Sequence, residues 1–214
     1  MDPTRFVILM AGPIHANGRL REAVRGRRAV AADGGIRHAR ALGLSPELWV
    51  GDFDSAAPAD LAGWPDVERL RLPRDKAETD GEVALVEARA RGARDVLLVG
   101  AMGGRSDHAF SHLVLLLREH ERGLRVEMSD GRERCVPLGP EPVRLDAANG
   151  TQFSVLRFSD VEGLTIRGAR FPLHDVALPF GSLLTQSNEA TGPVEIGCRS
   201  GRALVLLQED ESAR

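Results

Sequence analysis

The stretch Leu48-Trp49-Val50-Gly51-Asp52-Phe53-Asp54-Ser55 places two carboxylates directly after an apolar run. Three apolar residues and a glycine predict the end of a buried strand. Asp52 and Asp54 would leave this strand in the crevice where α/β sheets usually bind ligands. Residues i and i+2 of an extended segment point the same way, so the two carboxylates would lie about 7 Å apart on one face. Because such carboxylates repel each other, we expect a hard cation such as Mg²⁺ between them.

The same two aspartates also fit a purely structural role. They are common turn and N-cap residues, and Ser55 would cap a short helix from Pro58 to Trp64. A DxD pattern is short, so the choice between the two roles depends on the rest of the chain.

Composition excludes several classes of protein. The chain has 214 residues, with 43% hydrophobic and 28% charged, which is typical of a globular protein of one or two domains. A net charge of -3 gives no reason to expect a nucleic-acid partner or a membrane surface. Cys135 and Cys198 lack CxxC spacing, so neither a disulfide framework nor a zinc site is indicated. Met1 to Arg5 has no signal-peptide pattern and Phe6 to Ala11 is too short to span a bilayer, so we expect a cytoplasmic protein.

Two apolar runs near the N-terminus predict buried strands. Phe6 to Ala11 is followed by Gly12, and Ala29 to Ala32 is followed by Asp33-Gly34-Gly35. A carboxylate and two glycines between a strand and a helix suit close approach to a phosphate or ribose, although a plain tight turn has the same composition. Residues Ile36 to Leu42 then form a predicted helix that Gly43 ends.

The polar run from Arg74 to Asp80 precedes another predicted helix, from Asp80 to Arg91. Thr79 and Glu82 have capping-box spacing, and capping alone would explain both Thr79 and Asp80. The functional alternative makes Asp80 a third carboxylate near the metal. It makes Lys76, the single lysine of the chain, a phosphate contact.

A further strand, Asp95 to Gly100, leads into Gly103-Gly104-Arg105-Ser106-Asp107-His108 and a helix through Leu117. Glycines let the backbone approach a ligand, and an arginine forks onto phosphate oxygens. His108 and His112 are four residues apart, the spacing of two imidazoles on one metal. Without the glutamate of an HExxH pattern, we favour His108 near a phosphate or capping a turn.

The pattern changes near Leu124, where helical periodicity gives way to short β-rich runs separated by glycines. The expected strands are Arg125 to Met128, Glu133 to Val136, Thr151 to Phe158, Leu164 to Ile166, Val194 to Cys198 and Ala203 to Leu207. We therefore predict an α/β domain over residues 1–128 with a mainly parallel, Rossmann-like sheet. An all-β sandwich domain follows over residues 129–214.

Taken together and in order, these motifs closely resemble the thiamine pyrophosphokinase family. The resemblance rests on Asp33-Gly34-Gly35, Gly51 to Ser55, Lys76 with Thr79-Asp80, Gly103 to His108, and Ser187-Asn188-Glu189. It covers nearly the whole chain and includes Phe171-Pro172-Leu173 and Gly181 before the Ser-Asn pair.

The resemblance implies transfer of the terminal diphosphate of ATP to the hydroxyl of thiamine, giving thiamine diphosphate and AMP. It also implies Mg²⁺ and a homodimer whose active sites lie between the α/β domain of one subunit and the β domain of the other. Asp52, Asp54 and Asp80 would hold the metal, while Arg105 and Lys76 would face the phosphates.

The other site residues follow from the same resemblance. Asp107 would accept the proton of the thiamine hydroxyl or contact the metal. Ser187 and Asn188 would bind the aminopyrimidine, although a polar β-turn has the same composition.

Two positions depart from the family pattern. Ala77 stands where an acidic residue often follows the lysine, so either one outer contact of the metal or ATP site is missing or Asp75 or Glu78 replaces it. The β domain has no Trp or Tyr, which leaves Phe171 or Phe180 as the aromatic wall beside thiamine.

Three other functions share some of these features. A diphosphokinase for a hydroxymethylpterin or another primary alcohol would keep the metal and ATP residues. An aspartyl-phosphate phosphatase also uses a strand followed by Asp-x-Asp, but with the nucleophile usually after the first strand. A nucleotide- or thiamine-binding regulator without turnover would be consistent with Ala77.

Overall fold

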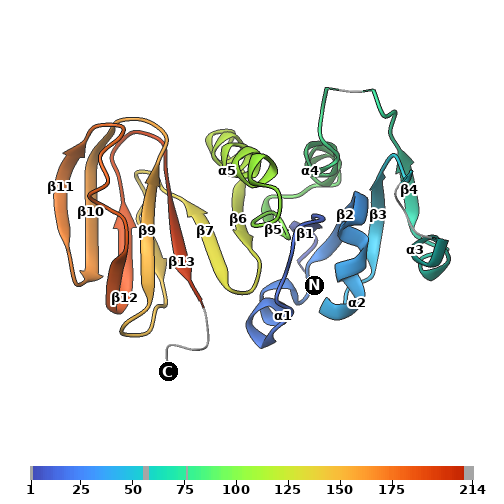
Figure 1. Cartoon of the computed structure of the whole chain (residues 1–214), viewed down its shortest axis with the longest axis horizontal. Helices are drawn as coiled ribbons and strands as arrows, with labels where there is room; N and C mark the ends of the chain where they lie inside the picture. The colour runs from blue at the N-terminus through green and yellow to red at the C-terminus, as the bar shows by residue number, and fades with distance from the viewer. Residues whose placement is uncertain (1, 55–57, 76, 210–214) are drawn as a thin grey trace. The chain divides into compact units, whose positions relative to one another are not determined.

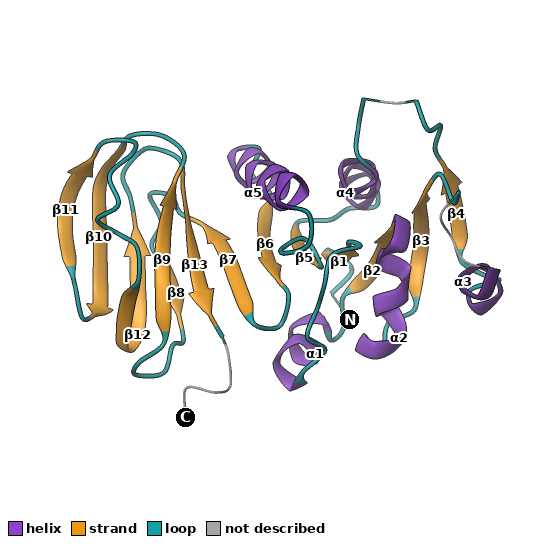
Figure 2. Ribbon diagram, in the orientation of Figure 1, coloured by secondary structure: helices purple, strands orange, loops and turns teal. Residues whose placement is uncertain are grey.

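The computed structural model describes residues 2–54, 58–75 and 77–209. Two compact units meet in sequence between Gly131 and Arg132. The first unit is α/β and the second contains strands (Figures 1 and 2). Within the described residues, no helix is long and apolar enough to cross a membrane.

Strands and helices alternate along the first unit. Its elements are β1 (Arg5–Leu9), α1 (Gly18–Val24), β2 (Arg28–Ala32), the 3-10 helix η1 (Asp33–Arg37), α2 (His38–Leu42), β3 (Pro46–Gly51), α3 (Pro58–Gly63), β4 (Glu68–Arg71), α4 (Asp80–Ala90), β5 (Asp95–Val99), α5 (Ser106–Glu121) and β6 (Arg125–Ser129).

The strands of this unit pair in parallel in the order β6-β5-β1-β2-β3-β4. Leu9, the last residue of β1, pairs with Ala31 of β2 and Val99 of β5, so these strands end at the same edge. The chain runs outward from β1 to β4 and then returns to the other side of β1 as β5. This change of direction is the point at which open α/β sheets bind ligands.

Both faces of this sheet are buried, as expected for parallel strands. Val7, Leu9 and Trp49 face one core together with Leu20 of α1 and Ile36 of η1. The alternate positions Phe6, Ile8, Val30 and Leu48 are also fully buried. Figure 1 shows α1 and α2 on one side of the sheet and α4 and α5 on the other.

Local signals placed several helix ends correctly. Gly43 ends α2 in the left-handed conformation, with φ of 67°. Thr79 and Glu82 form the expected capping box at the start of α4. The helix α5 runs to Glu121, beyond the expected Leu117, and Ser55 lies outside the described residues.

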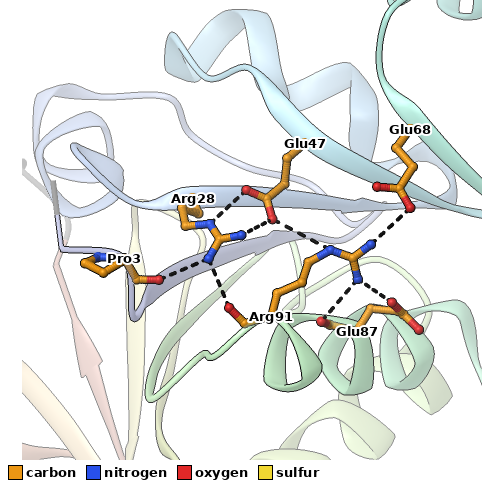
Figure 3. A network of polar contacts seen from close by, with 6 residues as sticks. All are labelled: Pro3, Arg28, Glu47, Glu68, Glu87 and Arg91. Carbon is orange, nitrogen blue, oxygen red and sulfur yellow. Dashed lines mark hydrogen bonds and ion pairs between the residues drawn. The ribbon is translucent and has the colours of Figure 1, made fainter.

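An ion-pair network joins the amino-terminal ends of β2, β3 and β4, opposite the edge where the strands end (Figure 3). Glu47 of β3 accepts two hydrogen bonds from Arg28 of β2, at 2.9 and 2.7 Å. Arg91 at the end of α4 reaches Glu68 of β4 at 3.1 Å and also pairs with Glu87. These contacts tie α4 to the sheet edge away from the expected site.

The second unit is built from antiparallel strands: β7 (Glu133–Pro137), β8 (Val143–Leu145), β9 (Gln152–Arg157), β10 (Val161–Ala169), β11 (Leu173–Leu178), β12 (Asn188–Gly197) and β13 (Ala203–Gln208). The first two residues of β12 pair with β9 and Val194 to Ile196 pair with β8, whereas β10 pairs with β12 from Ala190 to Gly197. The strands enclose a core that includes Phe153, Leu164 and Val205. Cys135 and Cys198 are buried free thiols.

Some strands were missed by the sequence predictions. The strand expected over Arg125 to Met128 is present as β6, which pairs in parallel with β5. The strands β8 and β11 were missed. In β11, exposed and less exposed residues do not alternate and Asp175 adopts a φ of 51°, so no apolar alternation marks the strand.

Gly35 provides a test of the close packing at the sheet edge. A Cβ at Gly35 would lie 2.0 Å from the carbonyl oxygen of Leu9, whereas a Cβ at Gly18 would meet nothing within 4 Å. We expect Gly35→Ala to lower the free energy of unfolding by about 1–3 kcal/mol or more, because backbone must move. Gly18→Ala, at the start of α1, should change it by less than about 1 kcal/mol. Urea unfolding of both variants checks this, and equal effects would contradict it.

Candidate active site

A cleft of about 340 Å³ lies at the carboxyl ends of the central strands of the first unit. Four separated stretches line it: residues 10–13 after β1, 32–33 after β2, 79–81 at the start of α4, and 100–105 (Met102 excepted) after β5, together with His108 and His112. The structure thus brings Asp33, Thr79, Asp80, Arg105 and His108 around one space.

Gly12 and Gly100, which the sequence marked only as the ends of strands, bring the loops after β1 and β5 into contact at this cleft. The Gly12 N–H donates to the carbonyl oxygen of Gly100 at 2.9 Å. A Cβ at Gly12 would lie 2.5 Å from that oxygen, and a Cβ at Gly100 would lie 2.5 Å from the carbonyl oxygen of Met10. Only glycine allows the two backbones to lie this close. The sequence feature that could have predicted the contact is the glycine at the end of each apolar run.

The Asp33-Gly34-Gly35 motif forms the start of η1. Asp33 has a φ of 43°, an unfavourable region for a residue with a side chain. Its carbonyl oxygen accepts a hydrogen bond from Trp49 Nε1 at 2.8 Å, which helps to hold this conformation. The motif is therefore a constrained turn against the cleft, and the turn and ligand interpretations are compatible.

Asp52 and Asp54 form a turn beside the cleft and do not line it. A Cβ at Gly51 would lie 3.4 Å from the Asp33 Cα, so the turn adjoins the Asp33 loop. Phe53 between the two aspartates has a φ of 61° and is buried, with its ring 4.9 Å from that of Trp49. The buried ring leaves both carboxylates partly exposed on the outside of the turn.

Among the described residues, Arg74 contacts both carboxylates of this turn. Arg74 pairs with Asp54 and lies 4.0 Å from the Asp52 carboxylate. Asp52 also accepts the Asp54 N–H at 2.9 Å. Within the described residues, no three His, Cys, Asp or Glu side chains are grouped closely enough to hold a metal ion.

Thr79 and Asp80 combine a capping role with a place in the cleft. The Thr79 hydroxyl accepts the Glu82 N–H at 3.2 Å, and the Glu82 carboxylate accepts the Thr79 N–H at 3.0 Å. Glu82 also accepts a hydrogen bond from Arg118 of α5 at 2.8 Å. These contacts hold the start of α4 at the cleft. Lys76, the expected phosphate contact, lies outside the described residues.

Arg105 and Asp107 pair with each other at the start of α5. The Arg105 guanidinium donates to both Asp107 oxygens at 3.1 and 2.6 Å, and Asp107 also accepts the His108 N–H at 3.0 Å. The arginine bond lowers the pKa of Asp107 to about 2. Such a carboxylate is a weak proton acceptor near neutral pH.

His108 and His112 lie near each other, with ring centroids 6.2 Å apart. His112 Nδ1 is bonded to the carbonyl oxygen of Ala101 at 2.7 Å. A carbonyl oxygen can only accept a hydrogen bond, so Nδ1 of His112 must carry the proton. A protonated ring nitrogen has no lone pair with which to bind a metal. His38 and Trp49, to which the sequence assigned no role in the site, make similar bonds to cleft carbonyls through ring nitrogens. Such contacts leave no pattern in the sequence.

The second unit contains the other predicted site residues. Asn188 is buried, and its amide donates to the Phe171 carbonyl at 2.8 Å and accepts the Phe171 N–H at 3.1 Å. Ser187 has a φ of 55°, and its backbone N–H donates to Ser154 Oγ at 3.0 Å. Phe171 and Phe180 are 60% and 66% exposed. Asn188 thus fixes the backbone that carries one of the two exposed rings.

Comparison with known proteins identifies two matching family models. The model described as "Thiamin pyrophosphokinase, catalytic domain" matches residues 24–128. The model described as "Thiamin pyrophosphokinase, vitamin B1 binding domain" matches residues 142–202. The two matches fall on different sides of the division between the units.

Individual relatives agree with these matches. Thiamine pyrophosphokinase of Bacillus subtilis (strain 168) is 28% identical over 160 residues, covering 69% of this chain and 71% of the relative. The solved structure of thiamin pyrophosphokinase from Geobacillus thermodenitrificans has a TM-score of 0.82 and 27% identity, covering 98% of this chain and 99% of that one. The structure from Bacillus subtilis has a TM-score of 0.85 at 22% identity, covering 96% and 99%, and supports the fold.

The pair of Arg105 and Asp107 provides a direct electrostatic test. We expect Arg105→Gln to raise the pKa of Asp107 from about 2 toward the ordinary aspartate value near 4, because the charged hydrogen bonds are lost. Carboxyl carbon chemical shifts followed against pH measure this. Arg122→Gln, at the other end of α5, should leave the Asp107 pKa unchanged. An unchanged value in Arg105→Gln would show that the pair is not formed in solution.

Proposed function

The chain belongs to the thiamin pyrophosphokinase family, and we propose that it performs the reaction of this family with the triphosphate of ATP in the 340 Å³ cleft of the first unit. It is a diphosphotransferase that moves the terminal diphosphate of ATP to the hydroxyl of thiamine, giving thiamine diphosphate and AMP.

One observation carries the placement of ATP. Glycine-rich exits from β1, β2 and β5 meet the first turns of α4 and α5 around the same cleft. Exposed backbone N–H groups at helix starts favour anions, and glycines allow a close approach to phosphate oxygens. Asp33, Gly34 and Gly35 would adjoin the ribose or a phosphate, while Thr79, Arg105, His108 and Lys76 would contact the phosphates.

Asp52 and Asp54 suit Mg²⁺, because each offers only hard carboxylate oxygens and the two already share one cationic partner, Arg74. Enzymes of nucleotide chemistry commonly hold Mg²⁺ through one or two carboxylates, with phosphate oxygens and water completing the shell. A preformed cluster of three ligands is therefore not required. Asp80, which lines the cleft, is the proposed third contact. When bound, Mg²⁺ would neutralise charge on the phosphate oxygens.

The protein groups mainly position the reactants. In-line attack of an alcohol on the β-phosphorus needs little covalent work from an enzyme. Arg105 would stabilise negative charge on the transferred group or on the leaving AMP. Asp107 has a pKa of about 2 and is held by Arg105, so we assign it to orienting Arg105 or contacting the metal shell rather than to holding a proton.

We propose an ATP- and Mg-binding catalytic domain over residues 1–128, Rossmann-like in its parallel sheet, and a thiamine-binding β-sandwich over residues 129–214. Ser187 and Asn188 would serve the aminopyrimidine, and Phe171 or Phe180 would replace the missing aromatic wall. The family resemblance supports a homodimer with shared active sites. A cytoplasmic location agrees with two free thiols and with the use of ATP.

The assay that tests the activity compares acceptor alcohols. Incubation with Mg-ATP and thiamine should release AMP and form thiamine diphosphate in equal amounts, measured by chromatography. A hydroxymethylpterin in place of thiamine should give only background AMP. AMP formed with the pterin but not with thiamine would reassign the substrate, and tight binding without AMP would indicate a regulator.

The acidic pair is tested by removing one charge at a time. We expect Asp52→Asn and Asp54→Asn each to lower kcat/KM by about 100-fold or more and to raise the Mg²⁺ concentration needed for half-maximal rate. Asp66→Asn makes the same charge change at an exposed residue outside the site and should have no effect. A variant of Asp54 with a normal rate and normal Mg²⁺ requirement would refute the metal assignment.

The Asn188 contact predicts an indirect effect on thiamine. Asn188→Ala removes both hydrogen bonds to Phe171, so we expect the KM for thiamine to rise about 10-fold. If Asn188 acts through the Phe171 ring, then Phe171→Ala and the double variant should have the same KM. A further increase in the double variant would instead mean that Asn188 contacts thiamine directly.

A further inference from the structure

We propose that His38, Trp49 and His112 are positioning residues that set the shape of the phosphate cleft, each by donating a ring N–H to one backbone carbonyl of a different cleft loop. The inference rests on the proposed function, because it takes the cleft to be the site of the ATP phosphates.

The loop after β1 is held by His38. This residue begins α2 and is partly buried, and its Nε2 lies 2.8 Å from the carbonyl oxygen of Gly12. The opposite side of the same loop is held by the Gly12 N–H bond to Gly100. Gly12 is therefore fixed from two directions, by β5 on one side and by a helix start on the other.

The loop after β5 is held in the same way by His112. This residue lies in the second turn of α5, and its Nδ1 is 2.7 Å from the carbonyl oxygen of Ala101. The next glycines, Gly103 and Gly104, both have positive φ. A loop of this kind has many alternative conformations, so a side-chain anchor next to it removes more freedom than it would in a regular strand.

The loop after β2 is held by Trp49. The indole Nε1 donates to the carbonyl oxygen of Asp33 at 2.8 Å, and the ring is only 1% exposed. The same ring packs against Phe53 in the turn between Asp52 and Asp54. Trp49 therefore joins the strained Asp33 loop to the acidic turn through a single rigid side chain.

These bonds matter chemically because a carbonyl oxygen repels a phosphate. Gly12, Asp33 and Ala101 all line the cleft, and their carbonyls each accept a ring N–H. Such a bond satisfies the oxygen and fixes the peptide plane, in which N–H and C=O point in opposite directions. The loops are then ordered before ATP binds, so binding has a smaller entropy cost.

The bonds also define which nitrogen of each histidine carries the proton. The carbonyl partner requires N–H at Nε2 of His38 and at Nδ1 of His112. Burial is the main reason that the pKa of both side chains is lowered, which favours the neutral rings. A Gln amide nitrogen reaches approximately the position of Nε2, and an Asn amide nitrogen approximately that of Nδ1. The two histidines therefore need different replacements to keep the bond.

The test measures binding of a nonhydrolysable ATP analogue with Mg²⁺ by calorimetry, together with the KM values for ATP and thiamine. We expect His38→Ala, His112→Ala and Trp49→Phe each to weaken analogue binding about 5-fold, the effect of one lost hydrogen bond, with a thiamine KM within about 2-fold of wild type. His38→Gln and His112→Asn should bind normally. In His38→Asn and His112→Gln the amide nitrogen does not lie where the histidine N–H was, so these variants should bind the analogue as weakly as the alanine variants.

The controls separate the possible failures. His174→Ala, in the second unit, should bind the analogue as wild type does. If wild type binds no analogue, the proposed function fails; if wild type binds but the alanine variants bind equally well, this inference fails. Should an alanine variant not fold, the comparison of Gln with Asn at the same position decides, and equal affinities for the two would overturn the inference.

Discussion

The first unit depends on backbone segments that approach too closely for any side chain to lie between them. At Gly35 a Cβ would lie 2.0 Å from the Leu9 carbonyl, and at Gly12 it would lie 2.5 Å from the Gly100 carbonyl. Residues of three strand exits are thereby brought to one edge of the sheet. Because β1 lies between β2 and β5, this edge is also where the chain reverses its direction of travel across the sheet. The cleft follows from both facts.

A small number of contacts connect the closely packed strand ends to the turn that carries Asp52 and Asp54. Gly51 packs against Asp33, and Trp49 bonds to the Asp33 carbonyl while supporting the Phe53 ring. Phe53 and Asp33 both have positive φ, a conformation that costs free energy in residues with a side chain. The surrounding packing offsets this cost, and the result is a pair of carboxylates held partly exposed next to a cleft suited to phosphates.

The sequence predicted most of the first unit because its signals are local. Apolar runs followed by glycine located the central strands, and Thr79 with Glu82 located the start of α4. The second unit was harder, since only half of the residues of its edge strand β11 are exposed and no apolar alternation marks the strand. In the site, residue types were predictable but partners were not. Nothing local indicates that Asn188 bonds to Phe171 or that His38 reaches Gly12 across 26 positions.

A crystal structure of the enzyme with Mg²⁺ and a nonhydrolysable ATP analogue tests the central claim most directly. The triphosphate is predicted to lie in the cleft formed by the exits of β1, β2 and β5, with the metal bonded to Asp52 or Asp54 and to phosphate oxygens. A triphosphate bound elsewhere, or a metal in the site without either carboxylate, would contradict it.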